Sequence, residues 1–175
     1  MSGSHGDPAC DLAHGIGDVE RDWRLVVLSA SPVALWLLHW GTEVGYATTL
    51  VEPDPGRVTA EHRRHAGAVV PSVEDARPDA TCDVVATDHD TEALPELLAA
   101  ALRSPARWIG LMGSVKHAPP HVEPLQAMGF GDDEIAWIHR PIGLPIGSHT
   151  PPEIAMATLA GLIADRNSRT LELVT

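Results

Sequence analysis

Short apolar runs that alternate with longer helical stretches constrain the fold of this 175-residue chain more than any other feature. The run at residues 25–28 is apolar at every position, which is typical of a strand covered on both faces. Further strands are predicted at residues 47–51, 68–70, 83–87 and 107–112. Because strands that alternate with helices form parallel sheets, the pattern predicts the α/β class.

The stretches between these runs carry helix signals. At the first of them Ser31 is placed to cap a helix, Pro32 takes the first helical position and Gly41 is placed to end it. Thr91 or Asp90 is expected to cap a later helix. The predicted helices cover residues 31–40, 57–65, 91–103, 120–128, 132–139 and 151–166, and a last strand is expected at 171–174. We therefore predict a Rossmann-like three-layer α/β/α fold with a mainly parallel sheet.

Composition and charge limit the class of protein. Residues 1–22 show no apolar period and are expected to be flexible, and residues 23–175 are expected to form a single Rossmann-like domain. The 12 Lys and Arg against 24 Asp and Glu give a net charge of −12, which argues against binding to nucleic acid or to a membrane. The two cysteines, Cys10 and Cys82, are too few for a disulfide framework, so a reducing, cytoplasmic location is expected.

In a sheet of this type, ligands bind outside the carboxyl ends of the strands, where the strand order reverses. Polar residues or glycines follow several of the predicted strands, and we expect the loop at 143–149 to fold over the same edge. The candidate cofactor-binding residues at this edge are Ser29, Ala30, Ser31, Glu52, Asp88, His89, Gly113, Ser114 and Gly147. No catalytic residue is predicted.

The turn after the first strand matches the dinucleotide-binding fingerprint in position but not in composition. The fingerprint, G-x-G-x-x-G, lets the backbone approach a pyrophosphate, and Ser29, Ser31 and Ala34 stand at its glycine positions. Serine hydroxyls and a helix N-terminus also bind anions, so a phosphate site and a turn that binds nothing both stay open. Glu52 stands where an acid accepts hydrogen bonds from a ribose, and its alternative is an ordinary exposed acid.

Asp88, His89 and Asp90 follow the fourth strand and combine two carboxylates with an imidazole. No H-x-x-x-H or C-x-x-C spacing accompanies them, so we expect no metal ion there. Instead, Asp90 is expected to cap the next helix and Asp88 to hold the turn. With Glu52 these carboxylates surround a site for an anion, and Lys116 is the one basic residue just after the fifth strand. This imbalance predicts weak ligand binding.

Several phrases of the sequence together resemble one protein family. They are RWIGLMGS from Arg107, GF from Gly129 and PIGLPIGSHTPPEIA from Pro141, and TDHD from Thr87 and LLAAALRSPA from Leu97 fit the same pattern. They resemble the C-terminal Rossmann domain of the XdhC/CoxI family over about residues 24–166. The first turn reads SASPV from Ser29, where the family usually has GAGHV. The domain is expected to stand alone in this chain.

The resemblance implies an accessory protein of the XdhC type. Members of the family are maturation factors that bind molybdenum cofactor, support its sulfuration and deliver it to molybdenum hydroxylases. The implied cofactor is molybdopterin or NAD(P). The implied partner is a subunit of a xanthine dehydrogenase or CO dehydrogenase type of enzyme, or a fellow maturation factor. The oligomeric state stays open, with a homodimer as the commonest outcome for such domains.

Three functions follow from these observations. The first is an accessory binding module, which is not itself an enzyme. The second is a degenerate Rossmann scaffold that acts only through protein contacts. The third is an NAD(P)-dependent oxidoreductase, against which the turn without glycine argues. The one tyrosine, Tyr46, is expected to lie away from the crevice, and no catalytic pair stands out.

Overall fold

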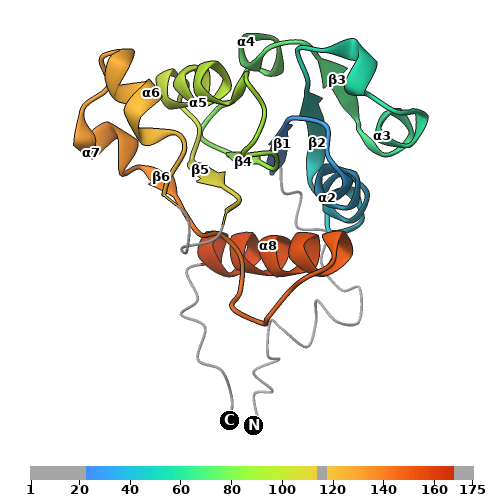
Figure 1. Cartoon of the computed structure of the whole chain (residues 1–175). Coiled ribbons are helices and arrows are strands. Elements are labelled where there is room, and N and C mark those ends of the chain that lie inside the picture. The colour runs from blue at the N-terminus through green and yellow to red at the C-terminus, as the bar shows by residue number, and fades with distance from the viewer. Residues whose placement is uncertain (1–22, 114–117, 168–175) are drawn as a thin grey trace, which may run out of the picture.

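The computed structural model describes residues 23–113 and 118–167 and has the predicted α/β fold (Figure 1). The strands are β1 (Arg24–Leu28), β2 (Ala47–Val51), β3 (Ala68–Val70), β4 (Cys82–Ala86), β5 (Trp108–Leu111) and β6 (Ile138–His139). The helices are α2 (Pro32–Glu43), α3 (Ala60–His65), α4 (Val73–Ala76), α5 (Leu94–Arg103), α6 (Val122–Ala127), α7 (Asp132–Ile135) and α8 (Pro151–Arg166), with a 3-10 turn, η1 (Pro55–Arg57). The strand predicted at 171–174 and the segment 1–22 lie outside the described residues.

The sheet places a ligand crevice at a defined point. Its strand order is β3-β2-β1-β4-β5-β6, and every pairing between these strands is parallel. The chain therefore builds outward from β1 on one side and then crosses over to β4 on the other. The carboxyl ends of β1 and β4 are neighbours at this reversal of strand order, where α/β sheets bind ligands.

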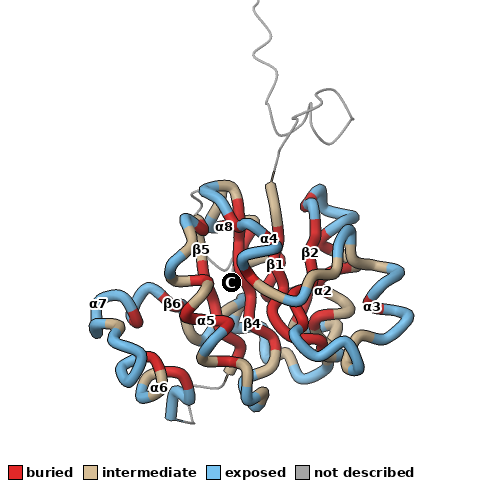
Figure 2. The backbone as a smooth tube through the Cα atoms, turned by 90° about the horizontal axis from the view of Figure 1, so that it is seen from above, coloured by how far each residue is buried: buried red, intermediate tan, exposed pale blue. Residues whose placement is uncertain are grey.

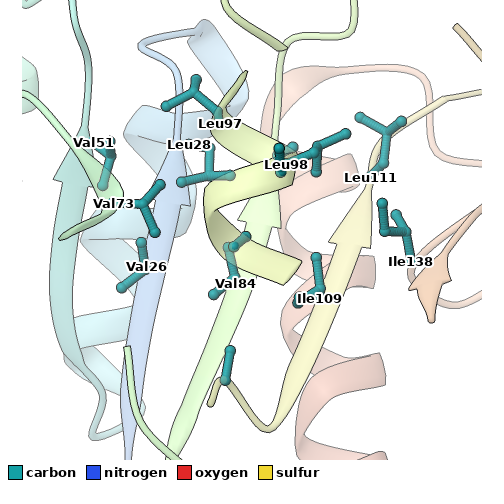
Figure 3. Packing of buried hydrophobic residues seen from close by; sticks show 14 of the residues in the cluster. Val26, Leu28, Val51, Val73, Val84, Leu97, Leu98, Ile109, Leu111 and Ile138 are labelled. Carbon is teal, nitrogen blue, oxygen red and sulfur yellow. The ribbon is translucent and has the colours of Figure 1, made fainter. Parts of the chain in front are cut away.

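Helices cover both faces of the sheet. In Figure 1, α2 and α8 lie on one face, and α4, α5 and α6 lie on the other. Successive side chains of a strand point to opposite faces, so Leu25 and Val27 pack with α2 and α8, whereas Val26 and Leu28 pack with α4 and α5 (Figure 3). All four are at most 1 % exposed, and Figure 2 shows burial concentrated in the central strands. This two-sided cover explains why the run has no polar residue.

The first helix is longer than its sequence predicts. It passes through Gly41 and ends at Glu43, just before Gly45, which has a φ of +90°. A Cβ on Gly41 would lie 3.0 Å from Cδ2 of Leu25 and 3.1 Å from Cγ2 of Thr48. Gly41 therefore allows the helix to approach the sheet closely, and the prediction that it ends the helix is wrong.

Other predicted boundaries also differ. The helix expected at 91–103 begins only at Leu94 and has no side-chain cap. The helix expected at 57–65 is divided, because Thr59 has extended backbone and caps α3. The helix expected at 132–139 ends at Ile135, and the edge strand β6 follows after a turn at residues 136–137. Among the described residues, no helix is long and apolar enough to cross a membrane.

Candidate functional site

The turn after β1 has the backbone of a glycine turn, although it contains no glycine. Ser29 has a φ of 71°, in the left-handed region that favours glycine, and is buried. Its N–H donates to the carbonyl of Val51 over 2.9 Å, and its carbonyl accepts from Oγ1 of Thr87 over 3.0 Å. Hydrogen bonds to Val51 and Thr87, on either side of β1, therefore hold the turn in the conformation of the fingerprint, with serine in place of the first glycine.

Ser31 caps α2, as its sequence predicts. Its Oγ accepts from the N–H of Ala34 over 3.0 Å and donates to Oγ1 of Thr87 over 2.9 Å. Its carbonyl lies 3.0 Å from Nε2 of His62, a buried residue of α3. Because these bonds occupy the hydroxyl, Ser31 ties α2 to the end of β4 instead of presenting an unused hydroxyl to a ligand.

Glu52 follows β2 and is buried, which excludes the alternative of an ordinary exposed acid. Its Oε2 accepts from the N–H of Ala30 over 2.8 Å, and its Oε1 accepts from the N–H of Asp54 over 3.0 Å. A guanidinium nitrogen of Arg57 lies 3.5 Å from Oε2. The carboxylate that would accept a ribose in a dinucleotide-binding domain here binds the protein's own backbone.

Arg57 is the residue of this edge that sequence reasoning missed. Its Nη2 donates to Oδ2 of Asp88 and, over 3.1 Å, to the carbonyl of Ala30, and its Nη1 donates to Thr91. The hydrogen bond to Asp88 raises the pKa of Arg57. The side chain thus spans from the first turn to the end of β4. Arg57 therefore places a cation between Glu52 and Asp88 that the charge imbalance read from the sequence did not include.

The segment after β4 behaves partly as predicted. Oδ1 of Asp88 accepts from the N–H of Asp90 over 3.1 Å, which holds the turn. Asp90 does not cap α5, because the helix starts later, with Ala93 at its N-cap. The imidazole of His89 is half exposed and lies 3.6 Å from a carboxylate oxygen of Asp90. Among the described residues, no group of three or more His, Cys, Asp or Glu is arranged to hold a metal ion.

A cavity of about 480 Å³ opens beside this turn, between the ends of β4 and β5, the N-terminal part of α8 and the loop 142–148. Its walls are mostly apolar, with Val33, Met112 and Ile154 among them. Thr87 and His89 contribute polar groups from the β4 side. The cavity therefore lies at the switch point, on the side of β4 and β5.

Gly113 lines the cavity and leaves room for a cation. A Cβ built on Gly113 would lie only 2.7 Å from Nε of Arg140, so a larger residue would collide with the guanidinium. The space beside this glycine is thus taken by an arginine from the segment after β6. Ser114, the next candidate residue, lies outside the described residues, as does Lys116.

The loop that closes the cavity rests on α8. Leu144 N–H donates to the carbonyl of Ala157 over 3.1 Å, and Gly143 has a φ of +86° at its contact with the same helix. Gly147 and Ser148 line the cavity from this loop. The Oγ of Ser148 is buried and makes no hydrogen bond within the described part of the chain. Ser148 therefore offers an unused donor and acceptor at the cavity.

The predicted site residues fall into two groups in the structure. Ser29, Ala30, Ser31, Glu52 and Asp88 form one group. Glu52 and Arg57 bond to Ala30, Arg57 also bonds to Asp88, and both serines bond to Thr87. His89, Gly113 and Gly147 form the other, along the cavity. A larger hollow, of about 790 Å³, lies between α4 and α5 and contains none of the predicted residues.

Comparison with known proteins identifies a family. The model of the XdhC Rossmann domain matches residues 25–162. The uncharacterized protein YqeB of Escherichia coli (strain K12) is 32% identical over 114 residues, which are 65% of this chain. That match spans only 20% of YqeB.

A solved structure shares the fold. It is described as a xanthine dehydrogenase from Bacillus halodurans, and it superposes with a TM-score of 0.69 at 23% sequence identity. The match covers 85% of this chain and 44% of the other. At this identity the likeness concerns the fold alone.

Proposed function

This chain belongs to the family of XdhC Rossmann domains, and from that premise we propose that it is an accessory domain that binds the pterin of molybdenum cofactor at the cavity beside β4 and serves a molybdenum hydroxylase. The observation that carries the proposal is the cavity itself. It lies at the switch point of the sheet, where domains of this architecture bind ligands. The proposed partner of the domain is a hydroxylase subunit or a fellow maturation factor.

The residues of the cavity fit a planar heterocycle. Apolar side chains such as Val33 and Ile154 offer flat contact, and Gly113 and Gly147 add no side chain that would fill the space. The buried hydroxyl of Ser148 lacks a partner within the described residues, and an unpaired buried polar group costs free energy until a ligand satisfies it. A pterin, whose edge carries several donors and acceptors, supplies such a partner.

The charged groups around the cavity would orient the ligand. The guanidinium of Arg140 lies against Gly113 and provides positive charge near the end of β5, toward which we place a phosphate. The half-exposed imidazole of His89 lines the cavity after β4. In this proposal the domain binds and shields the cofactor, and oxygen-atom chemistry at molybdenum belongs to the hydroxylase that receives it.

The test is binding of molybdopterin under anaerobic conditions. In equilibrium dialysis, with the bound pterin measured as its fluorescent oxidation product, the wild-type chain should retain the ligand. Ser148→Ala should weaken binding about five- to tenfold, the loss expected for one hydrogen bond of about 1 kcal/mol. Ser104→Ala is the matched control, because Ser104 donates to Ala101 at the far end of α5 and should leave affinity unchanged.

Other outcomes separate the competing functions. If the wild-type chain retains no pterin, the proposal is overturned. Recovery of a hydroxylase subunit on the immobilised chain, without any pterin, would then favour a scaffold that acts through protein contacts. Turnover of NAD(P)H with aldehydes or ketones would instead favour an oxidoreductase.

A further inference from the structure

The two halves of the crevice differ in what fills them, and this difference sets the size of ligand that the site accepts. In a dinucleotide-binding Rossmann domain, the first turn holds the pyrophosphate and the acid after β2 holds a ribose. The corresponding residues here are Ser29 to Ser31 and Glu52. None of them lines the cavity beside β4.

The acid at the ribose position already has its hydrogen-bond partners within the protein. Both carboxylate oxygens of Glu52 already accept a backbone N–H, from Ala30 at 2.8 Å and from Asp54 at 3.0 Å. The Glu52 side chain is only 3% exposed. A ribose hydroxyl would have to displace one of these bonds, and the freed N–H would lose its partner.

Arg57 occupies the space between the first turn and the end of β4. Its guanidinium bonds to the carbonyl of Ala30, to Asp88 and to Thr91, and it lies 3.5 Å from Glu52. Four partners hold it, and its side chain is one-third exposed. The guanidinium and its partners therefore fill the part of the crevice that the second half of a dinucleotide would need.

We infer that the domain selects its ligand by size: the cavity takes a ligand with one ring system and one phosphate, and Arg57 excludes the nucleoside half of a dinucleotide. The inference rests on the proposed function and concerns the same site. It identifies molybdopterin, and not its cytosine dinucleotide form, as the class of cofactor that this domain binds. Arg57 is then a residue that determines specificity without touching the ligand.

The experiment compares both forms of the cofactor on the wild type and on three variants. Anaerobic equilibrium dialysis of the full chain with molybdopterin and with molybdopterin cytosine dinucleotide gives the ratio of the two affinities. The wild type should bind molybdopterin at least about tenfold more tightly, a difference of about 1.4 kcal/mol. Arg57→Ala should narrow the ratio to about threefold or less, mainly through a gain for the dinucleotide.

A matched control separates position from charge. Arg64→Ala removes the same side chain from α3, where Arg64 pairs with Glu61 on the surface, and should keep the wild-type ratio. Asp88→Asn provides a second route: the amide oxygen still accepts from Asp90, but the guanidinium loses one of its two carboxylate partners. That variant should narrow the ratio in part. Thermal unfolding verifies that each protein is folded.

Each outcome is decisive. Equal affinity of the wild type for the two forms overturns selection by size and leaves the proposed function standing. An unchanged ratio in both Arg57→Ala and Asp88→Asn shows that Arg57 does not exclude the nucleoside. Binding of neither form by any of the proteins overturns the proposed function, and the inference with it.

Discussion

Two arginines each lie between two carboxylates, one at the carboxyl ends of the strands and the other at their amino ends. The surroundings of the two arginines differ. At the carboxyl ends of the strands, Arg57 lies between Glu52 and Asp88. At the opposite edge, Arg107 donates to Oδ1 of Asp83 over 2.6 Å and 2.9 Å, and also to Asp165. The second group ties β4 and the start of β5 to α8.

The degree of burial gives the two groups different roles. Asp83 has no exposed surface, and burial raises its pKa despite the attraction of Arg107. Its second oxygen accepts from the hydroxyl of Tyr46 over 3.0 Å, and burial also raises the pKa of Tyr46. Arg57, in contrast, is one-third exposed and faces the crevice. The same arrangement of charges therefore stabilises the fold at one edge and limits the ligand at the other.

The largest loss of stability is expected from a change in the buried pair of Asp83 and Arg107. Asp83→Ala leaves Arg107 and the Tyr46 hydroxyl without a shared partner, which should lower the free energy of unfolding by about 3–5 kcal/mol. Urea denaturation measures the change. Asp165→Ala removes the half-exposed partner of the same arginine and should cost no more than about 1 kcal/mol. Equal losses in the two variants would contradict the distinction between a buried and an exposed pair.

Much of the fold was predictable, because burial leaves a local signature. The run from Leu25 to Leu28 is apolar throughout, since helices cover both faces of β1. The edge strand β6 carries no such signature: it has two residues, and one of them, His139, is exposed. Gly41 was misread for a related reason, because a glycine that ends a helix and one that lets a helix approach a sheet look alike in sequence.

The site was less predictable than the fold. The ends of the strands identified Glu52 and Asp88, because topology alone brings them to one edge. Arg57 lies beyond the end of β2 in a turn without a motif, and only the folded chain places it between those acids. The same holds for Ser148, whose buried hydroxyl follows from the way its loop rests on α8. Contacts between distant segments carry no local pattern.

The next largest loss of stability is expected at the N-cap of α2, which lies beside the crevice at the carboxyl ends of the strands. Ser31→Ala removes the acceptor of the Ala34 N–H and should lower the free energy of unfolding by about 1 kcal/mol. Ser31→Gly should cost only a few tenths of a kcal/mol, about a quarter of that loss, because glycine is tolerated at N-caps. Denaturant titration distinguishes them. A loss as large as that of Asp83→Ala would show that the crevice edge is as important for folding as the buried edge.

Restoring the glycines of the first turn tests whether the turn or Arg57 closes this half of the crevice. Ser29→Gly relieves a left-handed serine and should add about 0.5 kcal/mol of stability. The double change Ser29→Gly with Ser31→Gly should alter the affinity for NAD⁺ by less than about twofold, well under 1 kcal/mol, while Arg57 is present. Calorimetry tests this. A large gain in affinity from the glycines alone would show that the turn, and not Arg57, closes this half of the crevice.

The smallest effect is expected at Glu153, an exposed carboxylate of the capping box of α8. Its Oε2 accepts from the N–H groups of His149 and Thr150, and these backbone hydrogen bonds lower its pKa below the ordinary value of 4.5. The unfolded chain then binds the proton more tightly than the folded chain, so this contribution to stability is present above about pH 4.5 and is lost as the pH falls through the lowered pKa. Glu153→Gln keeps an acceptor but cannot titrate, so the loss of stability on acidification should be shallower than in the wild type. Urea denaturation at pH 6 and pH 3, on either side of the ordinary pKa of 4.5, measures this loss of stability. An unchanged slope would mean that the carboxylate does not stabilise the start of α8, the helix whose first turns border the cavity.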